Sequence, residues 1–228
     1  MSDCMDTSNI RTILFDYDGT LHNSMKIFPK AFNKAYQFLV DKGYAEPHNY
    51  SHQAIKHFLG ITPYEMWNAF GNDIPDSIKD EAHHILKTTL FSSIKNNEAE
   101  LFDWTPDVLR TLKGRGYHLG FISNCENYYM HAHTQAFKLG KYFDRMVCSE
   151  SYPGTQEKED VLKKLRPNLI DDIVIVGDRM HDIKAGKKNN VYTIGALYGY
   201  GKNNELDDAD LQIETILDLL DIFEGPKG

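Results

Sequence analysis

The sequence has little of three things that would assign it to other classes of protein. Its three cysteines, Cys4, Cys125 and Cys148, cannot all pair internally and show no CxxC spacing. No stretch approaches the roughly 18 consecutive apolar residues of a membrane-spanning helix. Basic residues are outnumbered, and the formal net charge is −8. We therefore expect a cytoplasmic protein with reduced thiols that binds neither membranes nor nucleic acid. The polar, acidic start MSDCMDTSN does not have the character of a signal peptide.

What the chain does contain is typical of a globular protein. It has 228 residues, of which 41% are hydrophobic and 25% are charged, so it can bury a sizeable core. Short apolar runs predict strands in RTILFD (11–16), YHLGFIS (117–123), RMVCSE (145–150), DIVIVGD (172–178) and VYTIGAL (191–197). Helical patterns follow the last four runs at about 126–139, 157–165, 181–189 and 214–223. Continuous apolar strands that alternate with helices predict a parallel sheet covered on both faces.

Residues 22–96 contain no comparable strand. They have the pattern of amphipathic helices interrupted at Gly43, Pro47, Gly60, Pro63, Gly71 and Pro75. The expected fold class is α/β, with a Rossmann-like three-layer α/β/α core and an inserted helical domain. We expect residues 1–21 and 97–228 to form the core, and residues 22–96 to form the insert.

Two aspartates, Asp16 and Asp18, follow the first strand in the segment FDYDGTLHNS. In open α/β sheets the ligand site lies beyond the carboxyl ends of the strands. Residues two apart in extended chain point the same way, so both carboxylates can face one cavity. They repel each other unless a cation or a proton is present, and Mg²⁺ prefers such oxygen ligands. Gly19 allows close approach of the backbone to a ligand, and Thr20 offers a hydroxyl. An ordinary Asp-Gly turn explains this fragment equally well.

Other expected strand ends add polar residues of the same kind. Ser123 and Asn124 follow one strand and suit a phosphate oxygen, whereas Asp178 and Asp182 follow another. Asp182 taken alone is explained as a helix cap. Lys158 stands near a helix start, and Lys163 and Lys164 further along are expected in solvent. Acids that can hold a metal, together with a lysine and a serine that can bind a dianion, indicate phosphoryl transfer. The sequence has neither the glycines of a Walker motif nor the glycine-rich loop of a kinase.

These residues stand in four motifs: DYDGT, the serine of FISN, the lysine of EKEDVL, and GDRMHD. With the later segment IGALYGYGKNNEL (194–206), the chain resembles the haloacid dehalogenase superfamily. The closest pattern is its phosphoglycolate phosphatase-like branch, which carries a helical cap after the first motif. The lysine motif departs from that pattern, because the usual Lys-Pro is Lys158-Glu159 here.

The resemblance implies a role for each motif residue. Asp16 is the nucleophile that forms an aspartyl-phosphate, and Asp18 is the general acid and base. Ser123 and Lys158 hold the phosphoryl group, and Gly19, Thr20 and Asn124 are expected beside the substrate. Mg²⁺ is expected at Asp16, the main-chain carbonyl of Asp18, and Asp178, with Asp182 in support.

The implied activity is Mg²⁺-dependent hydrolysis of a small phosphorylated metabolite of the phosphoglycolate or nucleoside monophosphate type, by a monomer or homodimer. A sugar-phosphate mutase similar to β-phosphoglucomutase is the closer alternative. A receiver-like domain and a non-catalytic interaction protein are more distant ones. Dehalogenation is disfavoured, since it needs no metal and no acid at Asp18.

The roles of several other residues have more than one interpretation. The loop at 59–67 is expected to contribute to substrate selection. Tyr64, Trp67 and Phe70 are candidates to pack on the leaving group, and the alternative is that Trp67 and Phe70 belong to the core of the insert. His22 and Asn23 are expected at a hinge, and Arg179 either pairs with a nearby acid or contacts a substrate carboxylate.

Overall fold

The computed structural model describes residues 7–59, 63–71, 73–152, 154, 157–170, 172–202 and 204–225, and of residues 63–65 the backbone alone. The chain divides into two compact units. One combines Met1–His22 with Leu101–Gly228, and the other is Asn23–Glu100. The insert therefore begins one residue later and ends four residues later than the expected range 22–96. Within the described residues, short 3₁₀ helices occur at Thr7–Asn9, Ser24–Lys26, Leu139–Lys141, Ser149–Ser151 and Arg166–Asn168.

The first unit is built on a six-stranded, wholly parallel sheet with the order β3-β2-β1-β4-β5-β6. The strands are β1 (Thr12–Phe15), β2 (His118–Ser123), β3 (Arg145–Cys148), β4 (Ile173–Gly177), β5 (Tyr192–Ala196) and β6 (Leu211–Ile213). Every residue of β1 and β4 is buried, and all of them except Thr12 are apolar, as expected for strands covered on both faces. Phe15 lies opposite Phe121 of β2 and Val176 of β4, so the residues that follow these strands meet at one edge.

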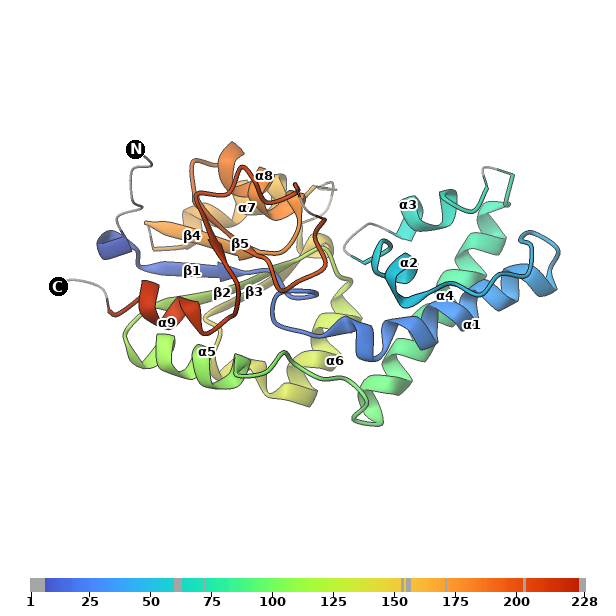
Figure 1. The fold of residues 1–228 in the computed structure, drawn as a ribbon, viewed down its shortest axis with the longest axis horizontal. Coiled ribbons are helices and arrows are strands. Elements are labelled where there is room, and N and C mark those ends of the chain that lie inside the picture. Colours follow the sequence, from blue (N-terminus) through green and yellow to red (C-terminus); the bar gives the residue numbers. More distant parts are fainter. Residues whose placement is uncertain are drawn as a thin grey trace. The chain divides into compact units, whose positions relative to one another are not determined.

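Helices cover both faces of this sheet. Figure 1 shows α7 (Lys158–Leu165) and α8 (Met180–Lys188) on one side, and α5 (Thr105–Gly114) and α9 (Asp218–Ile222) on the other. The helix α6 (Asn127–Phe137) follows β2. Under α7, the side chains of Val161 and Leu162 join Leu14 and Ile122 of the sheet in one buried cluster. The expected three-layer α/β class with an inserted helical segment is confirmed.

The end of the chain differs from expectation. A helix was expected over 214–223, but α9 runs from Asp218 to Ile222 and the short strand β6 precedes it. The carboxylate of Asp218 accepts the main-chain N–H groups of Glu214 and Thr215, at 2.8 and 3.0 Å. This turn joins β6 to α9, so the helix begins four residues later than expected. The helix α5 was not anticipated at all.

The second unit is helical throughout its described residues. It contains α1 (Phe28–Asp41), α2 (His52–Lys56), α3 (Pro63–Asn68) and α4 (Asp76–Lys95), and α1 packs along α4. Six rings pack together in this unit, of which Phe32, Tyr36 and Trp67 are buried and Tyr50, Phe58 and Phe70 are half-buried. Trp67 is only 2% exposed, so it belongs to the core of the insert. Residues 60–62 of the expected specificity loop, and the side chain of Tyr64, lie outside the described part of the chain.

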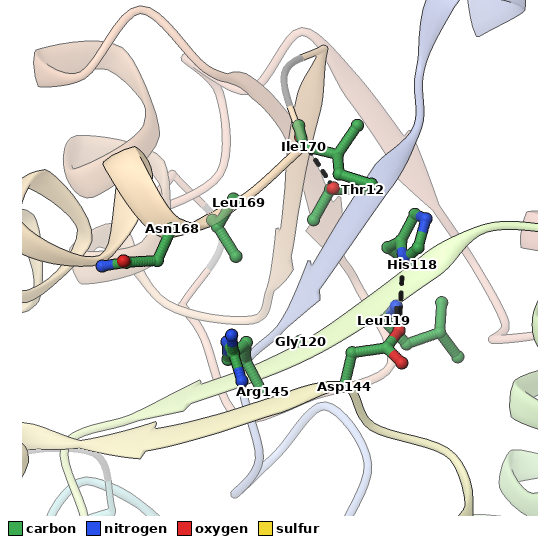
Figure 2. Close-up of a pocket in the computed structure, with 9 residues that line it drawn as sticks. All are labelled: Thr12, His118, Leu119, Gly120, Asp144, Arg145, Asn168, Leu169 and Ile170. Atoms are coloured by element: carbon green, nitrogen blue, oxygen red, sulfur yellow. Dashed lines mark hydrogen bonds and ion pairs between the residues drawn. The ribbon is translucent and has the colours of Figure 1, made fainter.

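A cavity of about 350 Å³ opens at the amino ends of the strands (Figure 2). Thr12, His118 and Arg145, the first residues of β1, β2 and β3, contribute to its lining. This edge is opposite to the one where Asp16 and Asp178 follow their strands. Among the helices of the described residues, none is both long and apolar enough to cross a bilayer.

Candidate active site

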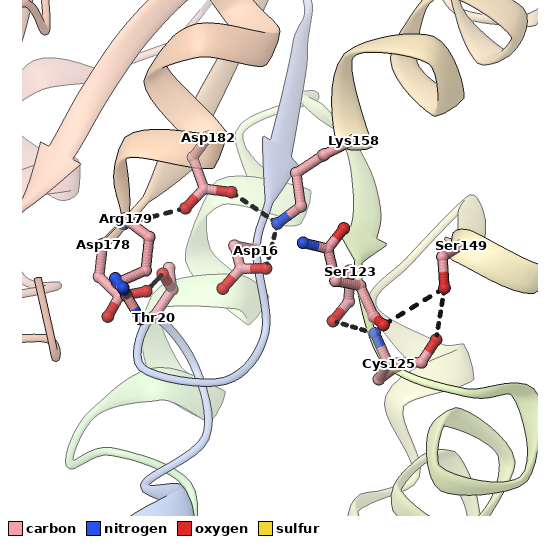
Figure 3. A network of polar contacts seen from close by, with 10 residues as sticks. Asp16, Thr20, Ser123, Cys125, Ser149, Lys158, Asp178, Arg179 and Asp182 are labelled. Carbon is pink, nitrogen blue, oxygen red and sulfur yellow. Dashed lines mark hydrogen bonds and ion pairs between the residues drawn. The ribbon is translucent and has the colours of Figure 1, made fainter. Parts of the chain in front are cut away.

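Three carboxylates meet beyond the carboxyl ends of the central strands (Figure 3). Asp16 directly follows β1, and its N–H donates to the carbonyl of Val176 at 2.9 Å. Asp178 directly follows β4, and Asp182 lies in the first turn of α8. One oxygen of each carboxylate lies within 4.8 Å of the other two, and all three residues are buried. The strand-end argument from the sequence therefore identified residues that are close in space.

Lys158 provides the positive charge beside these acids. It is the first residue of α7, and its Nζ donates to Oδ1 of Asp16 at 2.5 Å and to Oδ1 of Asp182 at 2.6 Å. The residue is 4% exposed. Lys163 and Lys164 are exposed on the same helix, as expected. Of these three lysines, Lys158 alone bonds to Asp16 and Asp182, despite its unusual neighbour Glu159.

The electrostatic balance of this group is negative. Burial raises the pKa of Asp16 well above its ordinary value, against the lowering effect of Lys158, and the charges of Asp182 and Asp178 raise it further. Burial and the charge of Asp182 raise the pKa of Asp178 to about 7. Burial lowers the pKa of Lys158, but Asp16 and Asp182 outweigh it, so the net shift is upward. One ammonium does not compensate three buried carboxylates. A divalent cation with oxygen ligands fits this donor set.

Asp178 is enclosed by main chain. Gly19 has φ +93°, and a Cβ built on it would stand 2.2 Å from Oδ2 of Asp178. A Cβ on Gly199 would stand 2.2 Å from Cβ of Asp178. The N–H of Tyr200 donates to Oδ2 at 2.6 Å, and the hydroxyl of Thr20 donates to Oδ1 at 3.4 Å. Gly19 and Thr20 were expected beside substrate, and the structure gives both a contact with Asp178. The loop at 199–201 belongs to the segment IGALYGYGKNNEL, to which the resemblance gave no contact with Asp178.

The carboxylate of Asp18 has different neighbours. Its Oδ1 lies 2.8 Å from Nδ1 of His22 and 2.9 Å from the hydroxyl of Tyr129. His22 was predicted at a hinge, and Tyr129 lies outside the four motifs. No signal in the sequence pairs these two residues, which are 107 positions apart.

The remaining expected residues lie around this centre. Ser123 is the last residue of β2, and its Oγ accepts the N–H of Cys125 at 3.2 Å. Oδ1 of Asn124 is buried and accepts no hydrogen bond within the described part of the chain.

The N–H of Arg179 donates to Oδ2 of Asp182 at 3.1 Å, so Asp182 caps α8 as well as binding Lys158. Nε of Arg179 donates to Glu205 at 2.8 Å. Of the two roles expected for Arg179, the structure therefore shows the pairing with a nearby acid, Glu205.

Comparison with known proteins identifies the family. The haloacid dehalogenase-like hydrolase family matches residues 13–196, which is most of the chain. The chain belongs to this family. The expected superfamily and the hydrolase class are confirmed, and members of the family that resemble the chain include phosphatases.

Curated relatives cover nearly the whole chain at low identity. The pyrophosphatase PpaX of Bacillus pumilus is 25% identical and aligns with 96% of this chain and 98% of its own. A 5'-nucleotidase of Pseudomonas aeruginosa is 26% identical, over 85% of this chain and 86% of its own. A predicted phosphatase from Clostridium acetobutylicum shares the fold with a TM-score of 0.76 and 25% identity, over 93% of this chain and 97% of that one. This haloacid dehalogenase-like hydrolase is therefore of the phosphatase type.

Proposed function

We propose that the chain hydrolyses a small phosphomonoester through a phosphorylated intermediate on Asp16, with Mg²⁺ as cofactor. The observation that carries the proposal is the contrast between two nearby acids. Asp16 is held by Lys158 within a buried group of carboxylates, whereas Asp18 is held apart from that group by His22 and Tyr129. Such a separation suits a nucleophile and a proton donor that act in one reaction.

In the first step, a carboxylate oxygen of Asp16 attacks phosphorus, and the bond between phosphorus and the ester oxygen breaks. Asp18 gives its proton to the leaving oxygen, so an alcohol departs and an acyl phosphate remains on Asp16. The ammonium of Lys158, the hydroxyl of Ser123 and the amide of Asn124 bind the phosphoryl oxygens and offset their charge.

In the second step, Asp18 is a carboxylate and accepts a proton from water. The oxygen of that water attacks phosphorus, the acyl phosphate bond breaks, and inorganic phosphate leaves with Asp16 and Asp18 restored. Mg²⁺ bound by Asp16, Asp178 and the main-chain carbonyl of Asp18, with Asp182 in support, would supply positive charge that reduces repulsion between nucleophile and phosphate. The upward pKa shifts of Asp16 and Asp178 support the need for such a cation.

We infer a small substrate of the phosphoglycolate or nucleoside monophosphate class. We expect a helical insert after the first motif to obstruct macromolecular substrates, and the net charge of −8 to repel nucleic acid. The relatives support this class by name: one is a 5'-nucleotidase, and a predicted phosphoglycolate phosphatase from Haemophilus somnus has the same fold with a TM-score of 0.78. Inorganic pyrophosphate joins the candidates because other relatives are named pyrophosphatases.

The test is a panel of phosphorylated metabolites, scored by kcat/KM with Mg²⁺ and again with excess EDTA. It includes phosphoglycolate, nucleoside monophosphates, pyrophosphate and β-glucose 1-phosphate, with product analysis. We expect release of inorganic phosphate that stops in EDTA. An isomerised sugar phosphate in place of free phosphate would identify a mutase. Full activity in EDTA would refute the metal, and preference for a phosphoprotein would refute the substrate class.

A further inference from the structure

Two buried residues bind the same oxygen of Asp18. Nδ1 of His22 lies 2.8 Å from Oδ1, and the hydroxyl of Tyr129 donates to Oδ1 at 2.9 Å. A carboxylate oxygen can only accept, so His22 must present Nδ1–H when Asp18 is ionised. Neither contact uses Oδ2. When Asp18 takes up a proton, Oδ2 is the oxygen that can receive it while both donors keep their bonds.

The two donors are themselves fixed by packing. His22 is fully buried and stacks on the ring of Tyr17, with centroids 5.3 Å apart and planes at 11°. Its ring also meets that of His133 edge-on at 4.4 Å, and His133 accepts from or donates to the hydroxyl of Tyr17 at 2.8 Å. Tyr129 packs on His133 from the same helix, α6, with centroids 4.2 Å apart. These contacts hold both donors in one orientation toward Asp18.

Apolar residues of similar size would fill this space without the cost of burying polar groups. Burial of the Nδ1–H group of His22 and of the hydroxyl of Tyr129 is favourable only when these two groups find partners. Here both partners are the same oxygen of the residue proposed to transfer the proton. The choice of His and Tyr is therefore better explained by the placement of Asp18 than by core packing alone.

We propose that His22 and Tyr129 are positioning residues that fix the carboxyl group of Asp18 and direct its proton-bearing oxygen, Oδ2, toward the leaving group. This proposal rests on the proposed function of Asp18. It concerns the orientation of the carboxyl group and adds no chemical step of its own. Loss of either donor removes one of these two hydrogen bonds, so the carboxyl group of Asp18 rotates more readily about its last side-chain bond and the proton is less often in place when the ester bond breaks.

A defect in proton donation has a specific kinetic signature. Phenyl phosphate releases a poor leaving group that needs a proton, since a phenol has a pKa of about 10. The leaving group of p-nitrophenyl phosphate is far more stable as an anion, and the ester has nearly the same size. General acid catalysis therefore matters much more for the first ester. The parameter to compare is kcat/KM, which reports the formation of the intermediate on Asp16.

The experiment measures kcat/KM on both esters for Tyr129→Phe, His22→Leu and His22→Asn, with Tyr142→Phe as control. Tyr142 is a second buried tyrosine of the same unit, at 4% exposure. For Tyr129→Phe and His22→Leu we expect a fall of about 10-fold on phenyl phosphate and less than about 3-fold on p-nitrophenyl phosphate. His22→Asn keeps an N–H donor and should recover most of the difference. Tyr142→Phe should leave the ratio of the two esters unchanged.

Equal losses on the two esters, or no loss, would overturn the positioning role while the hydrolase activity of the wild type stood. A wild-type protein that hydrolyses neither ester would overturn the proposed function, and this inference with it. If thermal unfolding shows that His22→Leu is not folded, Tyr129→Phe decides the question, because it keeps the ring and removes only the hydroxyl.

Discussion

Raising the pH from 5 to 8 should destabilise the metal-free protein. Burial and the neighbouring Asp182 raise the pKa of Asp178 from 3.8 to about 7. Between pH 3.8 and about pH 7, Asp178 keeps its proton in the folded protein and releases it in the unfolded chain. A carboxyl group whose pKa is raised by folding stabilises the folded state at low pH. This contribution to the free energy of unfolding is lost as the pH rises toward 7, because the group then ionises in a buried site that disfavours its charge. Asp16 shifts in the same direction.

The size of the effect follows from the shift. Each pKa unit corresponds to about 1.4 kcal/mol, so Asp178 alone lowers the free energy of unfolding by about 3 kcal/mol between pH 5 and pH 8. His133 opposes this trend at the acidic end, because burial lowers its pKa below 6.5 and its protonation destabilises the fold. The acids with lowered pKa, such as Asp144 and Glu205, titrate below the window.

The assay is urea unfolding in EDTA at pH 5, 6, 7 and 8, for the wild type and for Asp178→Asn. The difference between the two proteins isolates Asp178 from His133. We expect Asp178→Asn to become the more stable of the two as the pH rises. Millimolar Mg²⁺ should stabilise the wild type more at pH 8 than at pH 5, since protons compete with the cation. A pH-independent difference between the two proteins would refute the electrostatic account of this site.

Three further outcomes can be measured directly. Asp16→Asn should fold normally and lose at least about a thousand-fold in kcat, as expected for a nucleophile. Lys158→Ala should lower kcat and raise KM together, because its ammonium offsets phosphate charge before and during the reaction, whereas Lys163→Ala should change neither; the reverse ranking would refute the assignment. Gly19→Ala should lower the melting temperature more than Gly43→Ala does: both positions have positive φ, but a Cβ at Gly19 strikes a buried carboxylate and one at Gly43 meets nothing within 4 Å. Equal losses at the two glycines would contradict the close contact.

Much of the fold could be predicted because buried parallel strands leave a clear pattern. The run IVIVG, residues 173–177, is apolar at every position, since both faces of β4 are covered. Strand β6 lacks this signal. It has three residues at the sheet edge, and Gln212 among them is exposed. The apolar residues that follow it continue into a helical pattern, which is why the last helix was expected to begin too early.

The acidic part of the site could also be predicted, because strand order and strand ends are enough to bring Asp16 and Asp178 to one edge. The catalytic roles given to these residues remain predictions. Contacts that depend on the side-chain environment could not be foreseen. The carboxylate that requires glycine at position 19 belongs to Asp178, which follows the neighbouring strand β4 but is far away in the sequence. The donor Tyr129 likewise comes from a helix far along the chain. A polar residue within an apolar stretch signals that it has a partner but does not identify that partner.

The central claim is that Asp16 carries the phosphoryl group during turnover. Its most direct test is mass spectrometry of peptides from Asp18→Asn, quenched in acid during reaction with the best substrate and Mg²⁺. Asp18→Asn should slow the release of the intermediate as well as its formation, and we expect one added phosphoryl group on Asp16, absent when EDTA is present. Release of phosphate with no modification of Asp16 at any quench time, or modification of a different residue, would contradict the account.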